Sequence, residues 1–161
     1  MFEIIWGGAA NPKDKELMAA WCANHIWPGL EKSFGSCTTM GVIRKGRLIA
    51  VVVFHNWQPE CGVIEMSAAS TDKRWLTRRV LHAMFSYCFD TTGVQMVVLR
   101  TAPGDTAMRR IMKSYGFKSY CIARLRGRNE DELINTLTDD DWKSNRFERQ
   151  RHGKSKSTAT A

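Results

Sequence analysis

Residues 63–89 read VIEMSAASTDKRWLTRRVLHAMFSYCF, and their hydrophobic pattern changes period partway along the segment. Val63 to Ala69 form a largely apolar run of strand length, and the polar residues Ser70 to Arg74 follow it. From Trp75 to Phe89, apolar side chains recur about every 3.6 residues, which is typical of an amphipathic helix. The segment therefore predicts a buried strand, a short basic loop and a helix that packs on the sheet.

Three further elements are expected before this segment. Pro12 to Ile26 has helical spacing of its apolar residues, with Pro suited to the first turn and Asn11 available as a cap. Cys37 to Ile43 predicts a strand, and Gly46 marks the turn that follows it. Leu48 to Asn56 predicts a second strand, and its apolar run is too continuous for a strand that is solvated on one face.

Four elements are expected after it. Val94 to Leu99 predicts a buried strand, and Thr106 to Ser114 predicts a helix that Gly116 ends. Phe117 to Leu125 and Glu132 to Leu137 predict a final hairpin. The order is α-β-β-β-α-β-α-β-β. It predicts an α/β (α+β) fold with a mixed, mostly antiparallel sheet and helices on both faces.

Length and composition limit the classes of protein to which this chain can belong. The 161 residues suit a single domain, which we expect over residues 1–145, and no apolar run approaches the length of a membrane helix. The five cysteines are widely spaced and contain no C-x-x-C pair, so no zinc ribbon, other metal site or disulfide framework is expected. These features favour a cytoplasmic protein with no membrane partner.

The formal net charge of +8 is unevenly distributed. Residues 146–161 contain five Lys or Arg residues and one Glu, and they have almost no apolar side chain. Such a segment buries too little surface to offset the entropy of ordering, so we expect a disordered tail. A basic tail can bind nucleic acid through phosphates, but a solubilising end explains the same composition.

The order of elements, together with two motifs, resembles the GNAT superfamily of N-acetyltransferases over about two thirds of the chain. The first motif is Asp105-x-x-Met108-x-x-x-Met112-x-x-x-Gly116-Phe117. Family members have N-x-x-A-x-x-x-Y-x-x-x-G-F at this place. The final Gly-Phe pair matches, whereas Asp stands where Asn is usual and Met stands at the family's Tyr.

The second motif is the loop and helix start after the strand Val63–Ala69. In the family this loop has the pattern Q/R-x-x-G-x-G/A and holds the pyrophosphate of acetyl-CoA. Asp72, Trp75 and Thr77 occupy the patterned positions here, so the glycines are missing. The sequence Trp75-Leu76-Thr77-Arg78-Arg79 resembles a divergent GNAT subgroup found in phage and prophage genomes.

The resemblance implies acetyl-CoA as the acyl donor. The charge pattern is consistent with an anion at this place, because basic residues at a helix N-terminus otherwise oppose the helix dipole. The alternative is a solvated basic surface. The residues that we expect to contact the donor are Met66, Ser67, Ala68, Lys73, Arg74, Trp75, Leu76, Thr77, Arg78 and Asp105.

Two catalytic residues are expected. Glu65 lies in an apolar strand, where burial would raise its pKa toward that of a useful general base, although it can equally face solvent or pair with an Arg. His55, at the end of the neighbouring strand, is the alternative base. Tyr115 is the candidate general acid because the family's Tyr is replaced by Met112, and direct protonation by solvent would also suffice.

The predicted function is transfer of an acetyl group from acetyl-CoA to an amine. The acceptor can be a protein lysine or N-terminus, a small amine or an aminoacyl-tRNA. The alternative is a non-catalytic GNAT-fold module that binds CoA, nucleic acid or protein. The sequence leaves the oligomeric state open, with a dimer as one option.

Overall fold

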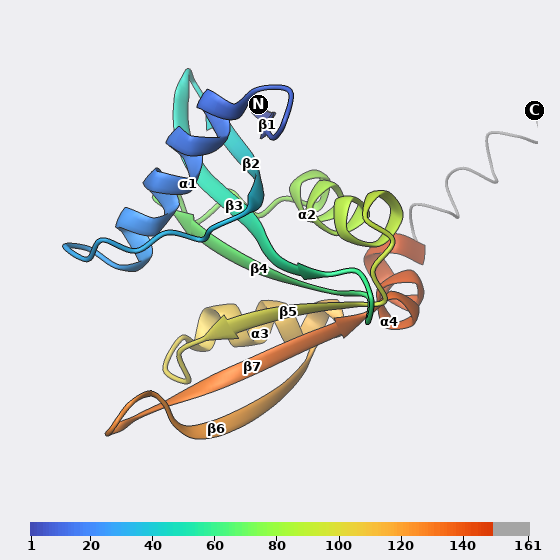
Figure 1. Ribbon diagram of the computed structural model, residues 1–161. Coiled ribbons are helices and arrows are strands. Elements are labelled where there is room, and N and C mark those ends of the chain that lie inside the picture. Colours follow the sequence, from blue (N-terminus) through green and yellow to red (C-terminus); the bar gives the residue numbers. More distant parts are fainter. Residues whose placement is uncertain (150–161) are drawn as a thin grey trace, which may run out of the picture.

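A computed structural model describes residues 1–149 (Figure 1). Within these residues one seven-stranded sheet has the strand order β1-β2-β3-β4-β5-β7-β6. The strands are β1 (Phe2–Gly7), β2 (Cys37–Arg44), β3 (Arg47–Gln58), β4 (Val63–Ser70), β5 (Met96–Thr101), β6 (Lys118–Gly127) and β7 (Glu130–Thr138). The helices are α1 (Pro12–Ile26), α2 (Arg78–Ser86), its π-helical continuation η1 (Tyr87–Thr91), α3 (Thr106–Tyr115) and α4 (Asp139–Ser144).

The pairing of β4 with β5 is parallel, and the other strand pairs are antiparallel. The parallel pairing of β4 with β5 is also short, because the last paired residues are Met66 and Leu99. Beyond that point β4 continues beside β3 as far as Ser70. β5 continues beside β7 as far as Thr101. The two strands therefore diverge, which Figure 1 shows as a wedge between β4 and β5.

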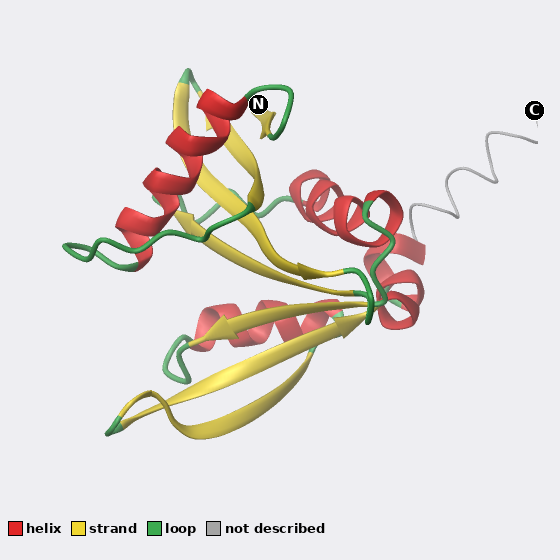
Figure 2. Cartoon of the chain, in the orientation of Figure 1, coloured by secondary structure: helices red, strands yellow, loops and turns green. Residues whose placement is uncertain are grey.

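Helices cover both faces of the sheet (Figure 2). On one face α1 packs on β1, β2, β3 and β4 through Met18 and Cys22, which contact Val51 and Val53. The other face carries the larger core, to which α2, η1, α3 and α4 contribute. The predicted fold class, a mixed and mostly antiparallel sheet between helices, is confirmed.

Local signals explain the bounds of the helices. α1 begins at Pro12 and ends at Ile26, as predicted, but Asn11 makes no side-chain bond to the helix. Its side-chain oxygen instead accepts a hydrogen bond from the Gly8 backbone N–H at 2.9 Å. α3 is capped by Asp105 and ends at Gly116, whose φ of 114° favours glycine.

Three elements were not predicted, namely β1, α4 and η1. β1 is a six-residue edge strand, and α4 is a single short helix capped by Thr138. The helix expected from Trp75 begins at Arg78, because Thr77 is its N-cap. Its second half is the π-helical turn η1 rather than a continuous α-helix.

The first residues of the predicted tail pack on the core. Residues 146–149 are helical, Phe147 contacts the larger core and Glu148 is almost fully buried. The rest of that prediction, residues 150–161, lies outside the described residues. Among residues 1–149, no helix is long and apolar enough to cross a membrane.

Candidate functional site

The wedge between β4 and β5 lies beside an apolar cleft. The cleft lies between the start of α2, the inner face of α3 and the two diverging strands. Its lining residues are Ala68, Trp75, Leu76, Leu81, Met84, Phe85, Leu99, Met108, Ile111, Met112, Tyr115 and Phe117. Such a lining suits a long, mostly apolar ligand that enters between two helices.

The edge of β4 that faces the wedge is free of β5 from Ser67 onward. Ser67, Ala68 and Ala69 have small side chains, so a ligand can approach the backbone closely. An extended ligand can pair with such an edge as an added strand. Ala68 lines the cleft, and Met66, which is two residues earlier on the same face of β4, is buried in the larger core.

The loop between β4 and α2 contains no glycine, and hydrogen bonds from side chains hold its shape instead. Asp72 accepts hydrogen bonds from the Arg44 guanidinium at 2.7 Å and from the Arg74 backbone N–H at 2.9 Å. The bond from the Arg74 backbone and then the Arg44 guanidinium hold the pKa of Asp72 below its ordinary value. The Thr77 hydroxyl accepts from the Val80 N–H at 3.2 Å and so caps α2. Both residues thus shape the loop.

The four basic residues of this loop and helix start differ in their surroundings. Lys73 is exposed, and the Arg74 side chain is 73% exposed although its Nε lies 3.4 Å from an Asp72 carboxylate oxygen. Arg78 stacks over the Phe147 ring at 5.2 Å, and Arg79 donates to the Phe2 carbonyl at 2.6 Å. Lys73 and Arg74 are therefore best placed to meet an anion at the start of α2.

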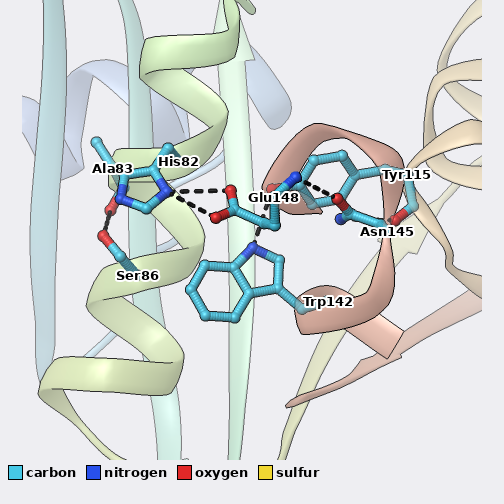
Figure 3. Close-up of polar contacts among 7 residues, drawn as sticks. All are labelled: His82, Ala83, Ser86, Tyr115, Trp142, Asn145 and Glu148. Atoms are coloured by element: carbon cyan, nitrogen blue, oxygen red, sulfur yellow. Dashed lines mark hydrogen bonds and ion pairs between the residues drawn. The ribbon is translucent and has the colours of Figure 1, made fainter. Parts of the chain in front are cut away.

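Two predicted site residues make contacts within the fold. Tyr115 is 2% exposed at the inner end of the cleft, and its hydroxyl accepts a hydrogen bond from Trp142 Nε1 at 3.0 Å (Figure 3). Asp105 accepts from the Met108 N–H at 3.2 Å as the cap of α3. Trp75 is buried in the core and also lines the cleft, whereas Leu76 is partly exposed there.

Glu65 lies on the opposite face of the sheet from the cleft. Its neighbours Ile64 and Met66 are buried in the larger core, so alternation along β4 directs Glu65 toward the α1 face. The side chain is partly exposed rather than buried, and it accepts a hydrogen bond from Asn56 Nδ2 at 3.3 Å. The partly exposed position is one of the alternatives that the sequence left open for Glu65.

His55 and Glu65 are directly opposed across β3 and β4. The His55 Nε2 atom lies 2.9 Å from the Ser67 hydroxyl, and the Phe34 ring lies 4.9 Å away. Burial lowers the pKa of His55, and the charge of Glu65 partly offsets that effect. The two candidate bases from the sequence therefore belong to one cluster.

This shift predicts a pH dependence of stability. Since the folded protein holds the pKa of His55 below the ordinary 6.5, the unfolded chain binds the proton more readily. The His55 contribution is full above that value and is lost as pH falls through the window below it. We expect the free energy of unfolding, measured with urea, to fall less between pH 7.5 and pH 5 in His55→Asn than in the parent protein. An equal fall in both proteins would contradict the assignment.

The sequence analysis missed an ion-pair cluster on the same face. Glu132 on β7 is 5% exposed, and its Oε2 accepts bonds from Arg100 Nε at 3.1 Å and Nη2 at 2.6 Å. Its other oxygen accepts a bond from Arg126 Nη1 at 3.2 Å. These three residues come from three strands, so no local sequence pattern indicates the cluster.

Metal and thiol chemistry find little support. Among residues 1–149, no group of three or more His, Cys, Asp or Glu side chains could hold a metal ion. The cysteines are all free thiols. Burial raises the pKa of Cys22 to about 12, so this thiol stays protonated and inert.

The chain matches the family model for the acetyltransferase (GNAT) domain over residues 3–118. A comparison with curated protein sequences gives no match. Solved structures share the fold at low sequence identity. A GCN5-related N-acetyltransferase from Brucella melitensis has a TM-score of 0.57 and 19% identity, over 69% of this chain and 54% of that chain.

Two other structures with this fold are named for their activities. A chimera of the spermidine N-acetyltransferase SpeG from Vibrio cholerae and hSSAT has a TM-score of 0.67 and 11% identity, over 88% of this chain and 97% of that chain. Ribosomal-protein-S5-alanine acetyltransferase from Vibrio fischeri has a TM-score of 0.57 and 15% identity, over 66% of this chain and 63% of that chain. The chain thus spans about half of the Brucella protein and less than two thirds of the Vibrio fischeri enzyme.

Proposed function

The chain belongs to the GNAT acetyltransferase domain family, and on that basis we propose that it transfers an acetyl group from acetyl-CoA to an amine acceptor. The observation that carries the proposal is the wedge between β4 and β5. It has the apolar cleft on one face of the sheet and the Glu65 carboxylate on the other. Two ligands that approach from opposite faces can meet where the strands part.

The residues around the cleft fit acetyl-CoA. The apolar lining and the small residues of β4 suit the pantetheine arm, whose amides can pair with the free strand edge. Lys73 and Arg74, beside the first N–H groups of α2, suit the pyrophosphate. When bound, acetyl-CoA supplies an acetyl group activated as a thioester.

Glu65 is our candidate general base. An amine with a pKa near ten is mostly protonated at neutral pH, so a group at the site must take its proton. Glu65 accepts that proton, directly or through water, as the new C–N bond forms and the C–S bond breaks. His55, whose Nε2 lies 2.9 Å from the Ser67 hydroxyl, stands beside it as the alternative base.

The sulfur that leaves needs a proton in turn. Tyr115 lines the cleft, and its hydroxyl accepts a hydrogen bond from Trp142. This contact gives Tyr115 a packing role, so we assign the proton on the sulfur to solvent and keep Tyr115 as the alternative acid.

Binding of acetyl-CoA tests the proposal. Calorimetry should show saturable binding, and Arg74→Glu or Lys73→Glu should weaken it about 10- to 100-fold, because each removes a charge-assisted contact to phosphate. Arg128→Glu is the matched control, since Arg128 is exposed in the turn between β6 and β7. Unchanged affinity in the loop variants would place the pyrophosphate elsewhere, and no binding at all would contradict the proposed function.

The acceptor is proposed only as an amine. The spermidine and ribosomal-protein enzymes that share the fold act on a small amine and on a protein, so both kinds of acceptor are compatible with it. The prediction that the basic tail binds nucleic acid falls largely on residues 150–161, which lie outside the described residues.

A further inference from the structure

Arg100 stands at the wedge on the same face as Glu65. Leu99 and Met66 face each other in the larger core, so their neighbours Arg100 and Glu65 both project to the α1 face. Arg100 is also the first residue of β5 beyond the last pair with β4. Val98 pairs with Glu65, which offsets the two charged residues by roughly 7 Å along the strands. The Glu65 charge favours the charged form of Arg100 and raises its pKa, after the larger effect of Glu132.

Glu132 fixes the Arg100 guanidinium in position. Both bonds go to one carboxylate oxygen, while Arg126 occupies the other oxygen. One buried carboxylate is thus shared by two cations, which leaves an excess positive charge at this end of the wedge. A charge held by a buried partner loses little conformational freedom when it binds a ligand.

The Arg100 guanidinium can still donate hydrogen bonds to an anionic ligand. A guanidinium has five N–H donors, and within residues 1–149 Glu132 takes up two of them. The Arg100 side chain is 44% exposed, so an incoming anion can reach the remaining donors. An anion here would lie on the face from which Glu65 meets the acceptor.

Given the proposed function, on which this inference rests, we propose that the acceptor is a small zwitterion, an amine that also bears a carboxylate, as in a free amino acid. Its ammonium group lies at Glu65 and its carboxylate at Arg100. The two opposite charges of the site match the two charges of such a substrate. A polyamine would meet Arg100 and Arg126 with like charge, which disfavours it.

Matched acceptor pairs test the substrate class. Each pair is an amino acid and the amine that remains when its carboxylate is removed, such as lysine with cadaverine and phenylalanine with phenethylamine. Turnover is followed as release of the CoA thiol. We expect kcat/KM for the amino acid to exceed that for its partner amine by about 10- to 100-fold, as for a charged hydrogen-bonded contact.

Arg100→Gln should remove this preference, because kcat/KM for the amino acid should fall to about that for its partner amine. Because that change leaves the buried Glu132 with Arg126 alone, the double variant Arg100→Gln/Glu132→Gln serves as a second test in which no unbalanced charge is buried. Arg47→Gln, at the exposed first residue of β3, is the matched control and should keep the preference. Thermal melts and acetyl-CoA binding check that each variant is folded.

Three results would overturn the inference while acetyl-CoA still binds. They are equal or better use of the decarboxylated amines, a preference that persists in both Arg100 variants, and acetylation of neither member of any pair. Loss of acetyl-CoA binding in the parent protein is a different result, because it overturns the proposed function and this inference with it.

Discussion

Glu65→Gln is expected to lower the turnover number about 10²- to 10⁴-fold, the usual contribution of a general base. Gln keeps the shape of the side chain and can still accept the Asn56 hydrogen bond, but it cannot take a proton. Acetyl-CoA affinity should hold, because the cleft lies on the other face of the sheet. The loss should shrink as pH rises and free amine accumulates.

Glu60→Gln is the matched control, since Glu60 is an exposed carboxylate in the loop before β4. An unchanged rate in Glu65→Gln would clear Glu65 of the role and direct attention to His55 or water. Loss of the folded state together with the rate would show instead that Glu65 supports the charge of Arg100. Circular dichroism separates these two outcomes.

A chain that ends at Ser144 is expected to be less stable than the parent by about 3 kcal/mol or more, because a packed aromatic and several buried polar contacts are lost. Asn145 donates to the Tyr115 carbonyl at 3.1 Å, and Glu148 pairs with His82 at 3.0 Å (Figure 3). Phe147 packs against Tyr115 with ring centroids 5.5 Å apart. For a protein of this size the melting temperature should drop by about 6–12 °C.

A chain that ends at Arg149 keeps these contacts and provides the comparison. Scanning calorimetry of the two truncated proteins isolates the contribution of residues 145–149. Equal melting temperatures would show that this segment adds nothing to the core. The hydrophobic pattern of this segment does not indicate its role, because only Phe147 among its five residues is apolar.

Long periodic segments were predicted well from the sequence. The bounds of α1 match, and β2, β3 and β4 lie within two residues of their predicted ends, because continuous apolar runs and turn glycines mark them. Gly116 indicated the end of α3 for a specific reason, since its positive φ excludes most other residues. These elements carry their signal locally.

The missed features depend on contacts between distant segments. β1 becomes a strand by pairing with β2, and Glu132 becomes buried because Arg100 and Arg126 from two other strands neutralise it. In each case the deciding partner lies far away in the sequence, so hydrophobic period and propensity could not indicate it.

In the proposed function, the loop between β4 and α2 binds acetyl-CoA from a preorganised state. Glycine-rich loops gain their anion-binding shape at a cost in backbone entropy, because glycine is the most mobile residue in the free state. Here Asp72 bridges Arg44 and Arg74, and Thr77 fixes the first turn of α2 before any ligand arrives. Association with acetyl-CoA should therefore order the backbone little and show a small entropic penalty. Rigidity supplied by side chains can thus replace the adaptability that glycines provide.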